Sequence, residues 1–195
     1  MKVAAPPGQA ELRGAETALA SGDWRMAAEL ARSSILAGDS GEAHAVLAVA
    51  LWCGYDTAAA IDEMKLAYRR LVDSGEVRRA AWIACWTGFE EAATHGDRAV
   101  ASGWFGRAAR LLQDVPPCPE HGWLLICRAA FTGDYQQLYT AAVEAEAIAV
   151  RFGSRDLELS ARAEQGMSLV LLGRVKEGMA LLDDAMVGVT AGDTT

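Results

Sequence analysis

Apolar residues recur along most of the chain at the three- and four-residue spacing that one face of an α-helix requires. Short turns that contain glycine interrupt this pattern, and in most of them an aspartate that can cap the next helix follows. The turns are ASGDW at 20–24, WCGYD at 52–56, THGDR at 94–98, FTGDY at 131–135 and LLGRV at 171–175. Because each turn lies between two helical stretches, the pattern predicts a chain of helical hairpins.

Five hairpins are predicted. The helix pairs are 9–21 with 24–37, 41–53 with 56–74, 76–94 with 98–113, 119–132 with 135–152, and 155–172 with 175–190. We therefore expect an all-α fold, a right-handed superhelical stack of about five antiparallel helix pairs. The expected organisation is a flexible N-terminus at 1–8, one helical repeat domain over 9–191 and a C-terminal tail at 192–195.

Small residues lie near the turns of several hairpins, where they would let neighbouring helix backbones approach closely. In the fifth hairpin Gly166 precedes the turn, and Gly178 and Ala185 follow it. This spacing of turns and small residues is similar to that of the tetratricopeptide repeat (TPR), a helix–turn–helix unit with a period of about 34 residues. The similarity is good in the first and fifth hairpins and weaker in the others.

The stretch DVPPCPEHGWLL, at 114–125, interrupts the helical pattern and has two interpretations. Cys118, His121 and Cys127 are ligand types that zinc prefers, but a fourth ligand would have to come from far away in the sequence. Cys127 also falls within an apolar helix. In the alternative interpretation the prolines end one helix, Cys118 stands at the N-cap of the next, and Pro119 is its first residue. We favour this rigid corner and expect no metal.

Composition and charge argue against several classes of protein. Of the 195 residues, 52% are hydrophobic, which is enough to bury a sizeable core. A formal net charge of −8 argues against nucleic-acid binding, which requires a basic face. No apolar run is long enough to span a bilayer, and the first residues lack the apolar core of a signal peptide. With four cysteines and no CxxC pair, we expect a cytoplasmic protein with reduced thiols.

No constellation of residues indicates catalysis. The chain has no GxSxG nucleophile elbow, and its three histidines leave few ways to form a Cys–His pair. Glu91 and His95 are four residues apart, which suits a contact on one helix face and falls short of a metalloprotease motif. We interpret His44 and His95 as surface or rim residues. We expect no enzymatic activity and no cofactor.

Several segments resemble the TPR region of LuxR-type transcriptional regulators, a group common in actinobacteria. The resemblance covers most of the chain and is carried by ETALASGDWRMA, PPCPEHGWLL, the GDY hairpin, RFGSRDLE and, most specifically, LLGRVKEGMALLDDAM at 171–186. It implies a regulatory domain that receives a protein segment or an effector. In those regulators a helix-turn-helix domain follows the repeats. This chain has no such segment, so the resemblance implies no direct DNA binding, and it supplies no catalytic residues.

Aromatic residues at helical spacing provide a candidate binding surface. In stacked repeats the first helix of each pair lines the concave side. The expected lining residues are Trp82, Trp86 and Phe89 in the third hairpin, Trp123, Cys127 and Phe131 in the fourth, and Met167 in the fifth. Glu120 and Arg128, near the mouth of this groove, would orient the polar end of a ligand. The alternative is that these stripes are ordinary helix-packing core.

Two functions are compatible with these features. The first is a non-enzymatic binding module, a regulatory or scaffolding domain for a protein segment or effector. The alternative is a stand-alone protein that binds or sequesters an apolar natural product in the aromatic groove. The last predicted helix carries apolar residues on more than one face, Met179, Leu182 and Met186 among them, and no helix follows it. We expect this end to be buried in a homodimer or by the rest of a longer parent protein.

Overall fold

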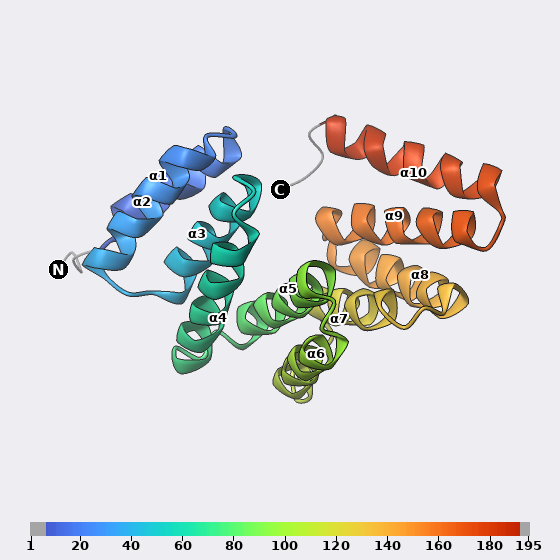
Figure 1. The fold of residues 1–195 in the computed structure, drawn as a ribbon, viewed down its shortest axis with the longest axis horizontal. Coiled ribbons are helices and arrows are strands. Elements are labelled where there is room, and N and C mark those ends of the chain that lie inside the picture. The colour runs from blue at the N-terminus through green and yellow to red at the C-terminus, as the bar shows by residue number, and fades with distance from the viewer. Residues whose placement is uncertain (1–6, 192–195) are drawn as a thin grey trace. The chain divides into compact units, whose positions relative to one another are not determined.

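The computed structural model describes residues 7–191, and within that range the chain forms ten α-helices and no β-strand (Figure 1). The helices are α1 (Gln9–Ala20), α2 (Trp24–Ala37), α3 (Gly41–Cys53), α4 (Thr57–Asp73), α5 (Val77–His95), α6 (Arg98–Leu112), α7 (Pro119–Ala130), α8 (Tyr135–Phe152), α9 (Arg155–Leu171) and α10 (Val175–Thr190). The predicted all-α fold of helix pairs is confirmed. The predicted helix ends differ from the observed ones by one or two residues at most.

Left-handed glycines and aspartate caps form the turns of the first, third and fourth hairpins. Gly22 has a φ of +78°, and the carboxylate of the next residue, Asp23, accepts a 3.0 Å hydrogen bond from the backbone N–H of Met26. The same arrangement recurs at Gly133 and Asp134. Glycine adopts this backbone without strain, and the carboxylate satisfies an N–H group that the first helical turn leaves unpaired.

The turn of the second hairpin is built differently. In WCGYD, Gly54 has a φ of −81°, and it is Tyr55 that takes the left-handed conformation, with a φ of +64°. The left-handed position comes directly before the capping aspartate, here Asp56, whose side chain accepts from the backbone N–H of Ala59 at 3.3 Å. Because this turn carries GYD where the first, third and fourth turns carry GD, the glycine stands one residue too early.

The chain divides into two compact units, the first reaching Arg107 and the second beginning at Ala108, both within α6. The predicted single repeat domain over 9–191 stays a prediction. The flexible ends predicted at 1–8 and 192–195 fall, but for Pro7 and Gly8, outside the described residues.

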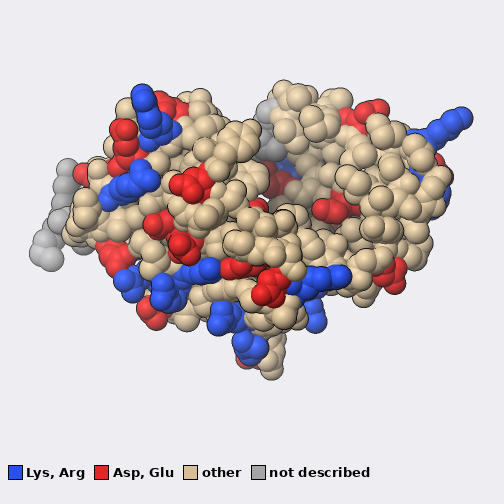
Figure 2. Space-filling model, in the orientation of Figure 1, with Lys and Arg blue, Asp and Glu red and all other residues tan. Residues whose placement is uncertain are grey.

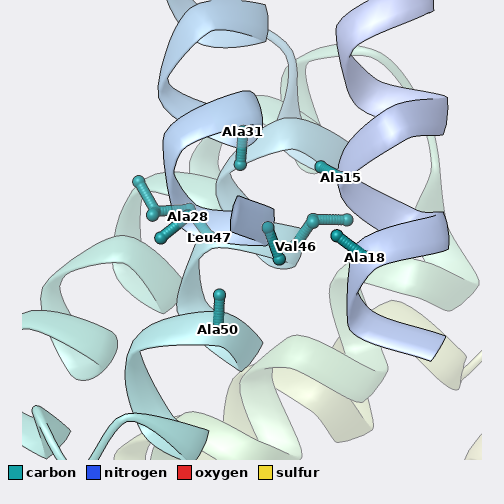
Figure 3. Close-up of a cluster of buried hydrophobic side chains, with 8 residues drawn as sticks. Ala15, Ala18, Ala28, Ala31, Val46, Leu47 and Ala50 are labelled. Atoms are coloured by element: carbon teal, nitrogen blue, oxygen red, sulfur yellow. The ribbon is translucent and has the colours of Figure 1, made fainter. Parts of the chain in front are cut away.

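Alanine-rich contacts form the core where the first three helices meet (Figure 3). The buried side chains of α1 and α2 in this cluster are all alanines, so the helices can approach closely. Larger residues of α3 and partly buried leucines and an isoleucine of α1 and α2 fill the remaining space. The buried members are Ala15, Ala18, Ala27, Ala28, Ala31, Val46, Leu47 and Ala50. Further along the first unit, α4 packs against both α3 and α5.

In the second unit, α8 packs against both α7 and α9, and α9 packs against α10. The last pair meets through two glycines. A Cβ atom added to Gly178 would lie 2.5 Å from the carbonyl oxygen of Gly166, and one added to Gly166 would lie 2.8 Å from that of Gly178. The two backbones are therefore in direct contact, which confirms the predicted role of small residues in the fifth hairpin.

The stretch 114–125 forms the corner that begins α7. Cys118 has extended backbone at the N-cap, and Pro119 is the first helical residue, as predicted. The Sγ atom of Cys118 lies 3.2 Å from Nδ1 of His121. Within residues 7–191, no three His, Cys, Asp or Glu side chains are grouped so that they could hold a metal ion.

A candidate binding face of tryptophans

Three tryptophans lie together where α3 meets α5, the first helices of the second and third hairpins. Trp82 and Trp86 are one turn apart on α5, with ring centroids 5.3 Å apart and planes inclined by 42°. Trp52, in the last turn of α3, meets Trp86 edge to face, with centroids 6.3 Å apart and planes inclined by 75°. We call this surface, made of Trp52, Trp82 and Trp86, the tryptophan face.

The tryptophan face is partly open to solvent. Trp52 is 45% exposed, and Trp82 and Trp86 are half-buried. The core side of α5 is formed by other residues, such as Ile83 and Thr87, which are fully buried. Half-open aromatic rings on rigid helices are typical of recognition surfaces, because they offer a large contact area at little cost in conformational entropy.

Arg79 packs against Trp82 at one edge of the tryptophan face. The Arg79 guanidinium lies 4.7 Å from the centroid of the Trp82 ring. Its Nε atom also donates a 3.2 Å hydrogen bond to a carboxylate oxygen of Glu42 on α3. The cation–π contact and the ion pair together join α3 to α5 beside the rings and restrict the orientation of Trp82.

A buried carboxylate anchors the other two rings. Glu90 is only 6% exposed, and Nε1 of Trp86 donates a 3.3 Å hydrogen bond to its Oε1 atom. Burial raises the pKa of Glu90, while hydrogen bonds from Trp86 and Trp52 act in the opposite direction. The Trp86 ring is therefore held against a buried acceptor, and its edge-to-face contact with Trp52 joins α5 to α3 at this surface.

The sequence pattern identified two of the three tryptophans. Trp52 was missed because it belongs to WCGYD, which the glycine marks as a turn, whereas the structure places Trp52 in the last turn of α3. Its position near the end of the first helix of the second hairpin could have identified it, because in a stack this helix lies beside the first helix of the third hairpin. Phe89, the remaining predicted residue of the third hairpin, is half-buried on α5.

In the second unit the predicted lining residues lie on or directly after α7 and on α9, which are in contact. Trp123 packs against a buried cluster that includes Ile126 and Leu157, so it is partly core. Met167 is 47% exposed. The other predicted residues range from buried to exposed: Cys127 is buried, Glu120 and Phe131 are half-buried, and Arg128 is exposed.

The predicted groove draws residues from both units, and the structure describes each unit by itself. It brings Trp82, Trp86 and Phe89 onto one helix of the first unit. It places Trp123 and Met167 on two contacting helices of the second. A continuous groove through all of these residues stays a prediction.

The histidines at 44 and 95 both contact carboxylates. His44, which the sequence placed at the surface or rim, is only 5% exposed, so that prediction was wrong. It is buried because both ring nitrogens have acidic partners, with Nδ1 2.5 Å from Glu63 and Nε2 2.7 Å from Asp39. His95 is half exposed, and its Nδ1 atom lies 2.8 Å from Oε2 of Glu91, which confirms the predicted contact along one helix face.

Acidic and basic side chains are mixed over the molecular surface visible in Figure 2. Basic side chains gather along its lower edge, over the place that α4 and α6 occupy in Figure 1. Within residues 7–191, no helix is both long enough and apolar enough to cross a membrane.

Comparison with known proteins supports the fold. No protein-family model and no curated protein matches the sequence. Among solved structures, the chain is similar to the nearly identical TPR-like repeats of a Podosopora anserina protein assigned to the kinesin light chains. The TM-score is 0.58 and the identity 12%, over 96% of this chain and 97% of that one. A variant of the same repeats gives a TM-score of 0.59 at 12% identity, over 95% and 96%. At this identity the similarity shows a TPR-like fold alone.

Proposed function

We propose that the chain is a non-enzymatic binding module that receives a segment of another protein on the tryptophan face. The proposal rests on the contact between Trp52 and Trp86, two partly exposed indole rings that connect the first helices of the second and third hairpins. Repeat proteins of stacked helices use such surfaces for binding, and tryptophan is enriched among the residues that dominate binding energy. The partner segment would place apolar side chains between the rings.

The second unit offers a further surface on α7 and α9. Met167 and Arg128 are open to solvent, and Phe131 and Trp123 are half-buried, so each offers surface to a partner. We propose that these residues form a binding surface of the second unit, with Arg128 and Glu120 pairing polar groups of a ligand and Cys127 supporting it from within the core.

The non-enzymatic part of the proposal is supported by the partners of the titratable groups. Glu90 accepts hydrogen bonds from tryptophans, and Glu91 is held by Lys65 and His95. Burial would raise the pKa of Glu91, but these two hydrogen bonds lower it below its ordinary value. Cys118, which lies beside His121, is 4% exposed, so its thiol is shielded from a substrate.

We propose further that the module forms the sensory region of a LuxR-type transcriptional regulator and works in the cytoplasm. The first part is supported by the resemblance of the sequence, most specific at 171–186. The second is supported by the cysteine pattern of the sequence, four cysteines with no CxxC pair, which suits a reducing compartment.

We also propose that a second copy of the chain covers the apolar groove between α9 and α10. The groove has a volume of about 310 Å³ and is lined by Asp156, Leu159, Ser160, Ala163, Leu182, Ala185, Met186 and Val189. Apolar side chains of α10 itself, including Met179 and Val187, are exposed. A two-fold contact would pack such side chains into the groove of the partner copy.

A displayed library of random peptides tests the binding function. Peptides are selected on the wild-type chain, and each is then measured on the Trp82→Ala/Trp86→Ala double variant and on Trp52→Ser. Trp24→Ala, at an exposed tryptophan on α2, is the matched control. We expect peptides with aromatic or apolar anchors that bind the wild type and the control but neither tryptophan-face variant. The proposal would be refuted if the library yields no binders, or if the selected peptides bind the tryptophan-face variants as tightly as the wild type.

Native mass spectrometry separates the protein-segment proposal from binding of an apolar small molecule. The chain is purified gently without added ligand. The proposal predicts a mass equal to that of the polypeptide or of its dimer. A mass excess of several hundred daltons that disappears on denaturation would instead support the small-molecule function.

A further inference from the structure

A second surface of the first unit lies on α4 and α6, the second helices of their hairpins, whereas the tryptophan face belongs to first helices. It contains a hollow of about 350 Å³ lined by Lys65, Tyr68, Arg69, Trp104 and Arg107. Three of these five residues are cationic and two are aromatic. We call this hollow the basic pocket.

The floor of the basic pocket is aromatic and rigid. Trp104 is only 7% exposed, and Tyr68 meets it edge to face with ring centroids 5.1 Å apart and planes inclined by 88°. The guanidinium carbon of Arg107 lies 4.3 Å from the Trp104 centroid and 6.0 Å from that of Tyr68. Stacking on these rings holds the guanidinium in place while its N–H donors stay open to solvent.

Two of the three cations in the basic pocket have no carboxylate partner within residues 7–191. Lys65 is neutralised, because its Nζ atom lies 2.9 Å from Oε1 of Glu91 and 3.7 Å from Oδ1 of Asp62. Arg69 and Arg107 are exposed, and neither forms an ion pair with the described part of the chain. On a chain of net charge −8, this pocket is therefore a local excess of positive charge.

The basic pocket continues into a second hollow along α4. That hollow, of about 310 Å³, shares Tyr68 and Arg69 with the basic pocket and adds Leu66, Arg70, Val72 and Asp73. Arg70 is already paired with Asp39, so the added surface is apolar and of mixed charge. An occupant that reaches both hollows must be elongated, which favours a peptide over a compact anion.

From this geometry we propose that the two hollows bind an acidic segment of a partner protein. Its carboxylates accept hydrogen bonds from Arg69 and Arg107, and its apolar side chains pack on Tyr68 and Val72. Nucleic acid fits less well, because a phosphate backbone requires a longer basic track, and Asp62 and Asp73 border this one. The proposal does not depend on the tryptophan face, since no residue is shared.

Fluorescence anisotropy of a fluorescein-labelled oligoglutamate peptide tests this proposal on the full chain. The Arg69→Glu/Arg107→Glu variant is compared with the wild type, and circular dichroism verifies that it is folded. Arg32→Glu is the matched control, because Arg32 is exposed on α2 and has no ion pair within residues 7–191. We expect saturable binding by the wild type, a loss of at least about tenfold in the double variant and a change below about twofold in the control.

Arg69→Lys/Arg107→Lys keeps the charge and removes the planar fork of donors, so we expect its affinity to fall between those of the wild type and the double variant. No saturable binding by the wild type, or an equal loss in Arg32→Glu, would overturn the proposal. Inorganic phosphate that displaces the peptide at equal concentration would identify a site for small anions instead. A single-stranded oligonucleotide that binds more tightly than the peptide, with the same dependence on Arg69 and Arg107, would identify a nucleic-acid site.

Discussion

Tyr55 is the one non-glycine residue with positive φ among residues 7–191. Its side chain is 95% exposed, so no packing offsets the strain of the left-handed backbone. For a residue with a Cβ atom that strain costs about 1–2 kcal/mol, whereas glycine loses about 0.5–1 kcal/mol through its greater freedom in the unfolded chain. The native turn is therefore less stable than a turn with glycine at position 55.

Replacement of Tyr55 by glycine is expected to raise the free energy of unfolding by about 0.5–1 kcal/mol, the difference between these two effects. Urea denaturation followed by circular dichroism measures it. The matched control is Gly22→Ala, at the equivalent position of the first hairpin, where a Cβ atom meets nothing closer than 3.8 Å. The control should lose about 1 kcal/mol. A destabilised Tyr55→Gly variant would mean that the tyrosine makes a stabilising contact.

The buried His44 is the centre of an ionic network that reaches the surface. Its two ring nitrogens contact Glu63 and Asp39, and Asp39 is also paired with Arg70. The hydrogen bond to Glu63 raises the pKa of His44 above its ordinary value against the opposing effect of burial, and the one to Asp39 adds to the increase. In turn, hydrogen bonds from Arg70 and His44 lower the pKa of Asp39. The folded state therefore favours a charged imidazolium between charged carboxylates.

This network predicts a stability that depends on pH in a defined direction. The pKa of His44 is higher in the folded protein than in the unfolded chain, where it is about 6.5. Protonated His44 therefore stabilises the fold fully below the pKa of the unfolded chain. This stabilisation is lost as pH rises through the pKa of the folded protein. Urea midpoints from about pH 6 to about pH 9 should therefore fall for the wild type. His44→Gln should be less stable than the wild type at pH 6 and should flatten this fall. An unchanged slope in His44→Gln would contradict the assignment.

Helix pairs depend on close backbone contact at particular glycines. A Cβ atom at Gly178 would lie 2.5 Å from the Gly166 carbonyl oxygen and 2.7 Å from Cγ2 of Val170. Gly178→Ala should therefore force α9 and α10 apart and lower the free energy of unfolding by about 1–3 kcal/mol. Gly103→Ala on α6 is the control, since nothing lies within 4 Å of its Cβ position, and it should be stabilising. Equal effects of both substitutions in urea denaturation would exclude the close contact.

The helices themselves were predictable because their signals are local. Gly22 and Asp23 mark a turn and a cap within two residues, and the 114–125 prolines can only end one helix and start another. The positions of Trp52 and His44 were not predictable in this way. Each depends on partners from another helix, Glu90 for Trp52 and Glu63 for His44, and no sequence spacing encodes those contacts.

The exposed apolar surface of α10 predicts self-association of the chain. Met186 and Val189 line the groove with α9, and Met186 is 59% exposed. Sedimentation velocity over a range of concentrations should show a dimer for the wild type and a monomer for Met186→Glu/Val189→Glu. Val143→Glu, at an exposed valine on α8, should still dimerise. A wild-type chain that stays monomeric at high concentration would rule out this interface.

Calorimetric titration measures whether a protein segment binds to the tryptophan face. A peptide selected on the wild-type chain is titrated into the wild type, Trp82→Ala/Trp86→Ala and Trp24→Ala. We predict a loss of at least about 2 kcal/mol in binding free energy for the double variant, as expected for residues at the centre of an interface, and no change for Trp24→Ala. Equal affinity for all three proteins, with each verified to be folded, would contradict binding at this face.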